Sequence, residues 1–196
     1  MNFFTKTAAV AALSVAAIIS PASAGEAGPY VTAGVGTGFN TEVSGEISGV
    51  EFDADGRTTL SGGIGLGFDT GENIRVELGV YRSISNVDSV KVSGSRYNVD
   101  ETGEAWSVGT RFFYDFGNNS NLTPFVGTGV GIGWGDDSDA AVWSIPLMAG
   151  VSYEATEAVD IYGQVTYAMT PGQDVDGVDY DFNGAFGVSM GIRLAL

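Results

Sequence analysis

The stretch TPFVGTGVGIGWG, residues 123–135, has a glycine at every second position from Gly127 to Gly135. A period of two is that of a β-strand, whose successive side chains point to opposite faces. Glycine weakens the interior of a strand and marks places where another group approaches the backbone closely. The stretch therefore predicts a strand with one apolar face and one face with little room. Substitution of leucine for Gly129 or Gly131 is expected to impair folding.

The same alternation recurs along the chain in eight runs, and no segment after residue 24 shows a helical period. The runs are centred on residues 31–39, 60–68, 74–80, 106–116, 126–134, 143–153, 159–167 and 186–196. The connections after the second, fourth and sixth runs are short. The other connections are residues 40–57, 85–103 and 170–181, which are long and polar, and residues 135–141, which are short and acidic.

Short turns at one end and longer loops at the other are typical of an antiparallel transmembrane barrel. Such a barrel needs no hydrophobic helix, because its strands satisfy one another's backbone hydrogen bonds. The sequence therefore predicts an all-β fold, namely an eight-stranded antiparallel up-and-down transmembrane β-barrel.

The composition of the two faces indicates which one points outward. A soluble barrel of the lipocalin kind would place the apolar set inside. The other set is mostly Gly, Ser and Thr, whereas a strand face in water usually carries long charged side chains. We therefore expect the small residues to line a narrow lumen. Buried charges need partners of opposite sign. The predicted lumen charge network consists of Arg75, Glu77, Arg111 and Arg193, whereas Asp115 and Asp160 are expected in water at strand ends.

Aromatic residues of the apolar face gather near the ends of the runs. Two aromatic girdles around an aliphatic band are characteristic of a lipid-facing barrel, and packing in a sandwich core is the alternative. The predicted girdle residues are Phe68, Tyr114, Phe116 and Tyr153 at the short-turn rim, and Phe39, Trp106, Trp134, Trp143 and Tyr167 at the long-loop rim.

The N-terminal segment has the three-part layout of a secretory signal peptide. Lys6 lies in its first part, an apolar stretch follows over residues 8–20, and Ala22-Ser23-Ala24 is a small-x-small cleavage site. We predict a signal peptide over residues 1–24 and one barrel domain over residues 25–196. Without Lys6, the only charged residue of the signal, the net charge changes from −16 to −17. Nucleic acid is excluded as a partner, because phosphate neutralisation requires Lys and Arg.

Four segments carry a family resemblance that covers the whole of the chain after the signal: GPYVTAGVGTGF, IRVELGVYRS, TPFVGTGVGIGW and VSMGIRLAL. On these, the chain resembles the small eight-stranded outer-membrane β-barrels, namely the OmpA-like transmembrane domain and the opacity-type porin-family surface proteins. The resemblance implies the outer membrane of a Gram-negative bacterium, with lipid, lipopolysaccharide and the barrel-assembly machinery as partners. Members of the family usually end in an aromatic residue that this machinery reads, whereas this chain ends in Leu196.

The inventory of reactive residues predicts that the protein is not an enzyme. Outer-membrane deacylases, palmitoyltransferases and proteases of barrel fold use histidine, and this chain has none. The glycines match neither a Walker loop, which ends in Gly-Lys-Ser/Thr, nor a dinucleotide fingerprint, which precedes a helix. No catalytic or cofactor-binding residue is predicted.

Fifteen of the 24 acidic residues fall in the four connections at the end opposite the short turns, namely residues 40–57, 85–103, 135–141 and 170–181. The stretch DVDGVDYD, residues 174–181, resembles fragments of calcium loops but lacks the spacing and the terminal glutamate of an EF-hand. A solvated acidic rim is the simpler interpretation. The alternative is a set of divalent cations that bridge these acids to lipopolysaccharide, for which the candidate ligands are Asp174, Asp176, Asp179 and Asp181.

These observations favour a non-enzymatic protein that supports the envelope and presents acidic loops for surface contact, as an adhesin does. Two alternatives remain open. One is a narrow pore for water, ions or small solutes, although eight strands leave an interior just wide enough for side chains. The other is a soluble periplasmic ligand-binding barrel.

Overall fold

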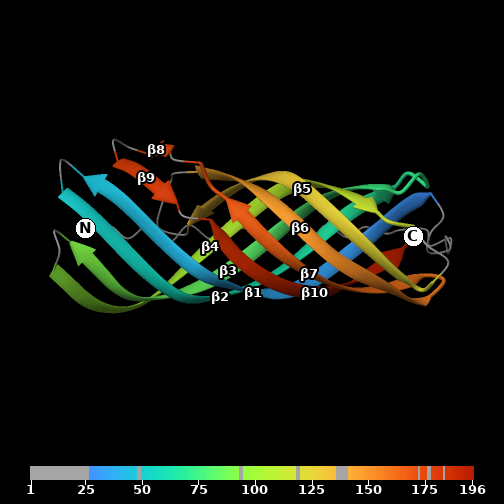
Figure 1. The fold of residues 1–196 in the computed structure, drawn as a ribbon, viewed down its shortest axis with the longest axis horizontal. Helices are drawn as coiled ribbons and strands as arrows, with labels where there is room; N and C mark the ends of the chain where they lie inside the picture. Colours follow the sequence, from blue (N-terminus) through green and yellow to red (C-terminus); the bar gives the residue numbers. More distant parts are fainter. Residues whose placement is uncertain are drawn as a thin grey trace, which may run out of the picture.

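The computed structural model shows an elongated barrel of β-strands (Figure 1). It describes residues 27–47, 50–92, 95–117, 120–135, 141–171, 173–175, 178–182 and 184–196. Within these ranges no helix is long and apolar enough to cross a membrane. The predicted signal peptide, residues 1–24, lies outside the described part of the chain.

Eight antiparallel strands form a closed ring. In ring order they are β1 (Gly28–Ile47), β2 (Val50–Asp69), β3 (Ile74–Val92), β4 (Ser95–Asp115), β5 (Leu122–Gly135), β6 (Ala141–Thr156), β7 (Val159–Met169) and β10 (Ala185–Ala195). The ring closes between β1 and β10, which pair from Tyr30–Ala195 to Phe39–Phe186. The predicted eight-stranded antiparallel barrel is confirmed.

One ladder of the ring contains a gap. The β5–β6 pairing runs from Leu122–Tyr153 to Trp134–Ala141, but Gly129 and Val130 have no paired partner in β6. In the register of this ladder they face Pro146 and Ile145. Proline has no backbone N–H, so Pro146 cannot donate a ladder hydrogen bond.

The two ends of the barrel differ, as the connection lengths predict. Short connections join β2 to β3, β4 to β5 and β6 to β7, and the first and last residues of the ring, Gly28 and Ala195, lie on this side. In the β2–β3 turn, the backbone N–H of Gly71 donates to Asp69 at 2.8 Å, and Asn73 takes a positive φ of 65°. We call this side the turn end and the opposite side the loop end.

The prediction of long polar loops at the loop end was wrong for most of their length, because strands continue through them. Residues 40–47 and 50–57 continue β1 and β2, and residues 85–92 and 95–103 continue β3 and β4. The segment 170–181 contains β8 (Gln173–Val175) and most of β9 (Val178–Phe182). The reason is that a hairpin can extend beyond a ring by pairing alone, as β1 and β2 do from Thr41–Gly56 to Ile47–Val50.

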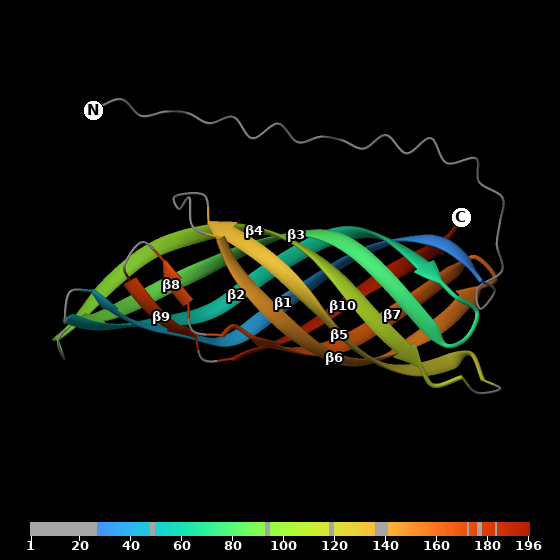
Figure 2. The same cartoon turned by 90° about the horizontal axis from the view of Figure 1, so that it is seen from above.

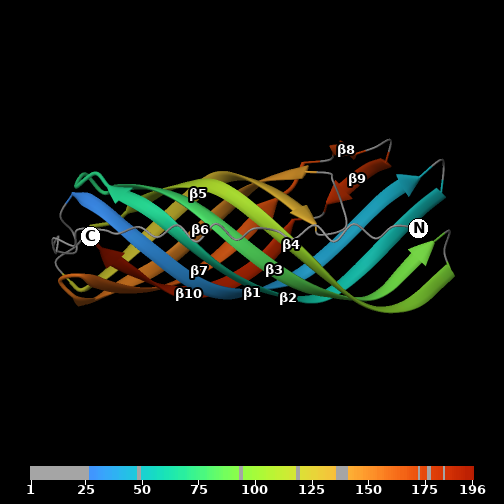
Figure 3. The ribbon, with the colours of Figure 1, turned by 180° about the vertical axis from the view of Figure 1, so that it is seen from behind.

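Beyond the ring these strands form an open sheet in the order β4-β3-β2-β1-β9-β8. Figure 1 and the views from above and behind (Figures 2 and 3) show the β1–β2 and β3–β4 hairpins projecting past the other strands. The projection lies at the end opposite the C-terminus. We call this part of the molecule the projecting sheet.

The apolar face of each strand of the ring points outward. Ile64, Leu78 and Val165 are among the 28 large apolar side chains exposed on the described surface, with exposed fractions of 68, 56 and 54%. The side chains inside the ring are instead small, polar or aromatic. A soluble barrel requires the opposite arrangement, so that alternative does not hold.

Candidate functional site

A cluster of two arginines and two phenylalanines crosses the lumen near the turn end. Arg75 on β3 is 3% exposed, and its Nε and Nη2 donate to the carboxylate of Asp115, with Nη2 2.8 Å from Oδ1. The guanidinium carbon of Arg75 lies 4.7 Å from the ring centroid of Phe113. Such a stack of cation on aromatic ring is favourable in a desolvated site. Arg75 is therefore held both by its ion pair and by the ring.

The second arginine is arranged in the same way. Arg193 on β10 donates from Nη1 to Asp160 at 3.2 Å, and its guanidinium carbon lies 5.7 Å from the ring centroid of Phe125. Phe113 and Phe125 meet edge to face, with centroids 5.7 Å apart and an interplanar angle of 86°. With Met148 these rings form the buried apolar cluster of the described residues. We call Arg75, Phe113, Phe125, Met148 and Arg193 the plug.

The structure corrects the placement of two acidic residues. Asp115 and Asp160 were expected in water at strand ends, but their side chains are only 14 and 20% exposed. Both lie near strand ends and turn inward, because each is the ion-pair partner of a plug arginine. The buried arginines require such partners.

A separate charged pair lies on the loop side of the plug. Glu77 on β3 is buried and accepts a hydrogen bond of 3.1 Å from the hydroxyl of Tyr81. The Nη1 of Arg111 on β4 lies 4.0 Å from Glu77, and its guanidinium stacks 3.9 Å above the ring of Tyr81. Of the four residues predicted as a lumen network, Glu77 and Arg111 thus lie together, whereas Arg75 and Arg193 each pair with an aspartate.

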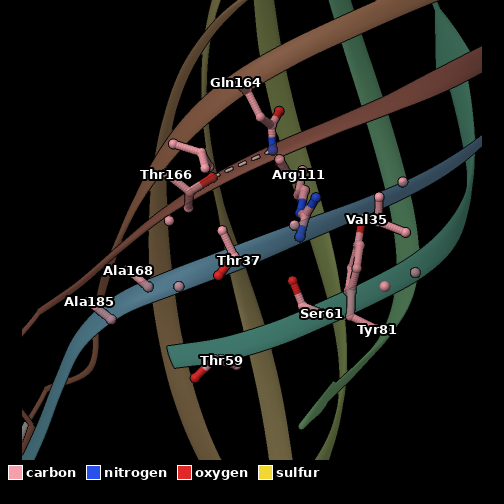
Figure 4. Close-up of a pocket in the computed structure, with 18 of the residues that line it drawn as sticks. Val35, Thr37, Thr59, Ser61, Tyr81, Arg111, Gln164, Thr166, Ala168 and Ala185 are labelled. Carbon is pink, nitrogen blue, oxygen red and sulfur yellow. Dashed lines mark hydrogen bonds between the residues drawn. The ribbon is translucent and has the colours of Figure 1, made fainter. Parts of the chain in front are cut away.

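The plug separates two chambers. Successive inward residues of β4 show this: Arg111 lines a chamber of about 240 Å³ towards the loop end, Phe113 belongs to the plug, and Asp115 lines a chamber of about 290 Å³ at the turn end. We call these the loop-side chamber and the turn-side chamber. Figure 4 shows the loop-side chamber, with Arg111 among side chains from several strands. The turn-side chamber is acidic and is lined by Asp69, Asp115, Glu154 and Asp160 together with Arg193.

Inward aromatic rings lie on glycines of the neighbouring strand. Five such pairs face each other directly in the ladders: Tyr30–Gly67, Tyr81–Gly63, Phe113–Gly127, Phe125–Gly150 and Tyr162–Gly191. In each pair, a Cβ atom on the glycine would overlap the ring. The glycines on the inward face of these strands therefore leave space for aromatic rings, in addition to fitting a narrow lumen.

The sequence analysis missed Tyr30, Phe113 and Phe125 as lumen residues, because it assigned aromatic residues to the lipid face. Their positions in the two-residue alternation of the strands were a signal that they point inward. Phe113 lies midway between Arg111 and Asp115, and Phe125 precedes Gly127 by two residues, so both belong to the inward set.

The predicted girdle residues lie on the outward face of their strands, near the two ends of the ring. Phe39, Phe68, Tyr114, Phe116, Trp134, Trp143 and Tyr153 are exposed by 41–53%, while Trp106 and Tyr167 are half-buried. Trp106 faces Trp134 across β4 and β5. The ring of Tyr167 packs 4.7 Å from that of Phe186, which the sequence analysis did not assign to the girdle.

The four candidate cation ligands lie in a part of the chain for which the structure describes no side chains. Asp176 lies outside the described residues, and for Asp174, Asp179 and Asp181 only the backbone positions in β8 and β9 are described. Those positions place Asp174 opposite Asp179, and Asp179 opposite Glu46 of β1. Among the residues whose side chains are described, no group of three or more carboxylates is arranged to hold a metal ion.

The family model for the outer membrane protein beta-barrel domain matches residues 8–196. No curated protein sequence is significantly similar to the chain. Among solved structures, Neisserial surface protein A is 20% identical, with a TM-score of 0.56, and the match covers 86% of this chain and 97% of that one. OprG from Pseudomonas aeruginosa is 17% identical, with a TM-score of 0.65 and coverage of 87 and 98%. AlkL is 16% identical, with a TM-score of 0.50 and coverage of 92 and 94%.

Proposed function

Because the chain belongs to the family of outer membrane protein β-barrel domains, we propose that it is a non-enzymatic protein that supports the envelope and makes contacts at the cell surface. It resides in the outer membrane of a Gram-negative bacterium, where its exposed apolar belt meets lipid and lipopolysaccharide. We further propose that the barrel-assembly machinery inserts it into that membrane.

The projecting sheet is the observation that supports a role in surface contact. A tilted transmembrane strand needs about 9–11 residues to cross the hydrocarbon core. β7 and β10 have 11 residues each, whereas β1 to β4 have 19–21 residues each. About half of each of these four strands therefore stands outside the hydrocarbon core, at the loop end. A paired, acidic sheet of this length offers an ordered surface for contact with other molecules.

The chemistry of the lumen supports a non-enzymatic role. The chain has no histidine, and the described charged side chains of the plug are engaged in ion pairs and aromatic stacks. A general base must instead be positioned towards a substrate. Binding of divalent cations by the acidic positions of the projecting sheet, as bridges to lipopolysaccharide, is a secondary element of the proposal.

A narrow pore is the second candidate, and the two chambers favour it. Water could fill both chambers, but a solute that crosses the barrel must pass the plug. The buried rings of Phe113 and Phe125 and their two arginines occupy that passage. A pore function therefore requires displacement of the plug, whereas surface contact does not.

Trimming the projecting sheet tests the proposal. Thr41 faces Gly56 in the ladder, so residues 42–55 can be replaced by Asn-Gly, a dipeptide that favours a two-residue hairpin turn. Cells lacking their own adhesins would display either form, and attachment to collagen and to cultured epithelial cells would be measured. We expect the trimmed form to attach less while its gel mobility still shifts on heating, as for a folded barrel.

Detergent sensitivity of the same cells tests the envelope role, because it should rise when the whole protein is absent but not when the hairpin is trimmed. Equal attachment by trimmed and full-length forms would contradict the surface-contact role. Conductance of the full-length protein in planar bilayers would favour the pore instead.

A further inference from the structure

The loop-side chamber is a cavity that surface contact by the projecting sheet does not use. Its volume of about 240 Å³ is several times the share of one water molecule in the liquid, which is about 30 Å³. Its lining extends from Thr32, Glu77 and Arg111 beside the plug to Gly38 and Ala185 near the loop end. A small solute would therefore enter it from outside the cell.

Hydroxyl groups from several strands line this chamber. Ser61 lies on β2 and Ser189 on β10, and both belong to the inward face of their strands. These two make no hydrogen bond to another side chain in the described part of the molecule. Gln164 and Thr166 on β7 add further polar groups, joined by a hydrogen bond of 3.5 Å. Figure 4 shows Ser61 and Gln164 around the same space as Arg111. Such groups can donate to and accept from the hydroxyls of a polyol.

Arg111 supplies the positive charge of the chamber. Its side chain is 22% exposed, whereas that of the neighbouring Glu77 is 7% exposed and already accepts from Tyr81. Arg111 is 4.0 Å from Glu77, which is too long for a hydrogen bond, and it donates none to the other described residues. Its planar face rests on the ring of Tyr81, so its N–H edge is held in place and unused.

A guanidinium held in this way matches one ligand chemistry. Arginine has five N–H donors in a fork that fits a carboxylate with two parallel hydrogen bonds. From these observations we infer that the loop-side chamber binds a sugar acid, with its carboxylate on Arg111 and its hydroxyls on Ser61, Ser189 and the Gln164–Thr166 pair. This site is independent of the projecting sheet, and so of the proposed surface contact.

Titration calorimetry of the folded protein in detergent, at constant ionic strength, tests this inference with D-galacturonate as the probe. D-galactose, which has the hydroxyls but no carboxylate, and acetate, which has the reverse, are the comparison solutes. We expect saturable binding of galacturonate and binding about tenfold weaker or less for either comparison solute. No saturable binding of galacturonate, or equal binding of acetate, would overturn the inference.

Two variants of equal charge locate the site. Arg111→Gln should weaken galacturonate binding by about tenfold or more, because both charge-assisted hydrogen bonds are lost. Arg82→Gln removes a cation from the outer surface, where Arg82 pairs with Glu104, and should leave binding unchanged. Equal losses in the two variants would overturn the assignment to the chamber.

A third variant keeps the charge and tests the hydroxyl contacts. Ser61→Ala with Ser189→Ala should weaken galacturonate binding and leave acetate binding unaltered. If Arg111→Gln fails to show the heat-dependent gel shift of a folded barrel, Arg111→Lys replaces it, since lysine keeps the charge but lacks the fork. Wild-type affinity in the folded Arg111→Lys variant would overturn the proposed contact.

Discussion

Phe113 and Gly127 face each other across β4 and β5, and the phenyl ring occupies the space that a Cβ atom on Gly127 would fill. Gly127 is the first of the alternating glycines of β5, and Phe113 is part of the plug. The ring that blocks the lumen therefore packs directly against the glycine backbone of the neighbouring strand. Its neighbour Gly131 differs, because a Cβ there would meet nothing closer than 3.5 Å.

Alanine substitutions at these two glycines should therefore differ in effect. In Gly127→Ala the new methyl group would lie 2.9 Å from the backbone oxygen of Phe112 and against the Phe113 ring. We expect a loss of about 1–3 kcal/mol in the free energy of unfolding, as for overpacked cores. Gly131→Ala should change it by less than about 0.5 kcal/mol. Urea unfolding in detergent micelles, followed by gel mobility, measures both, and equal losses would contradict this account.

Much of the ring could be predicted from the sequence, because alternation in strands such as β5 and β10 reports the two faces directly. The extensions of β1 to β4 could not, since they continue through polar residues that look like loops. Strand pairing there depends on the neighbouring strand, as Glu46 opposite Glu51 illustrates. Composition carries no signal for that kind of pairing.

The sequence indicated which residues face the lumen, but not which of them form ion pairs with one another. Parity placed Arg75 and Arg193 inside, but their partners depend on how the strands are staggered in the ring. Arg75 finds Asp115, 40 residues away, because β3 and β4 pair and the two side chains reach each other past Phe113. Gly129 and Gly131 look equivalent in the sequence, yet a Cβ on Gly129 would overlap the backbone oxygen of Thr110, whereas one on Gly131 has room.

The ion pair of Arg75 and Asp115 should be strongly stabilising relative to either partner alone. Asp115→Asn leaves the guanidinium of Arg75, which is 3% exposed, without its counter-charge. We expect a loss of about 3 kcal/mol in the free energy of unfolding, the lower end for a broken buried pair, because Asp115 borders the turn-side chamber.

Glu104→Gln is the matched control for this pair. It removes the partner of Arg82 in an ion pair on the outer surface, where the two side chains are 45 and 34% exposed. The expected loss is less than about 1 kcal/mol. Urea unfolding of the two variants under the same conditions compares them. A loss at Asp115 no greater than that at Glu104 would show that the plug does not depend on this pair.

Pro146 should leave the ladder between β5 and β6 open to amide exchange at the gap. Pro146→Ala restores a backbone N–H opposite Gly129. The change costs about 0.4–1 kcal/mol through the freer unfolded chain and gains a hydrogen bond of about 0.5–1.5 kcal/mol, so the free energy of unfolding should change by less than about 1 kcal/mol. Amide exchange at Gly129 should become slower, while exchange at Gly127, which is already paired with Met148, should stay the same. Unaltered exchange at Gly129 would contradict the proposed role of the gap.

Phe125→Ala should join the two chambers. Phe125 is 2% exposed, packs edge to face on Phe113 and lies under the guanidinium of Arg193, so its removal empties the centre of the plug. We expect the wild-type protein to show no stepwise conductance in planar bilayers and the variant to show small steady steps. The substitution should also cost about 3–5 kcal/mol of stability, so the heat-dependent gel shift must first show that the variant is folded.

Phe112→Ala is the control for this change. Its ring is 49% exposed on the outer face of the same strand as Phe113, and its loss leaves the lumen intact. This variant should remain closed in the bilayer. A folded Phe125→Ala variant without conductance would show that the two arginines and Met148 close the barrel without the ring. Steps of equal size in the wild-type protein would show that the plug is not a barrier and would favour the narrow pore over surface contact.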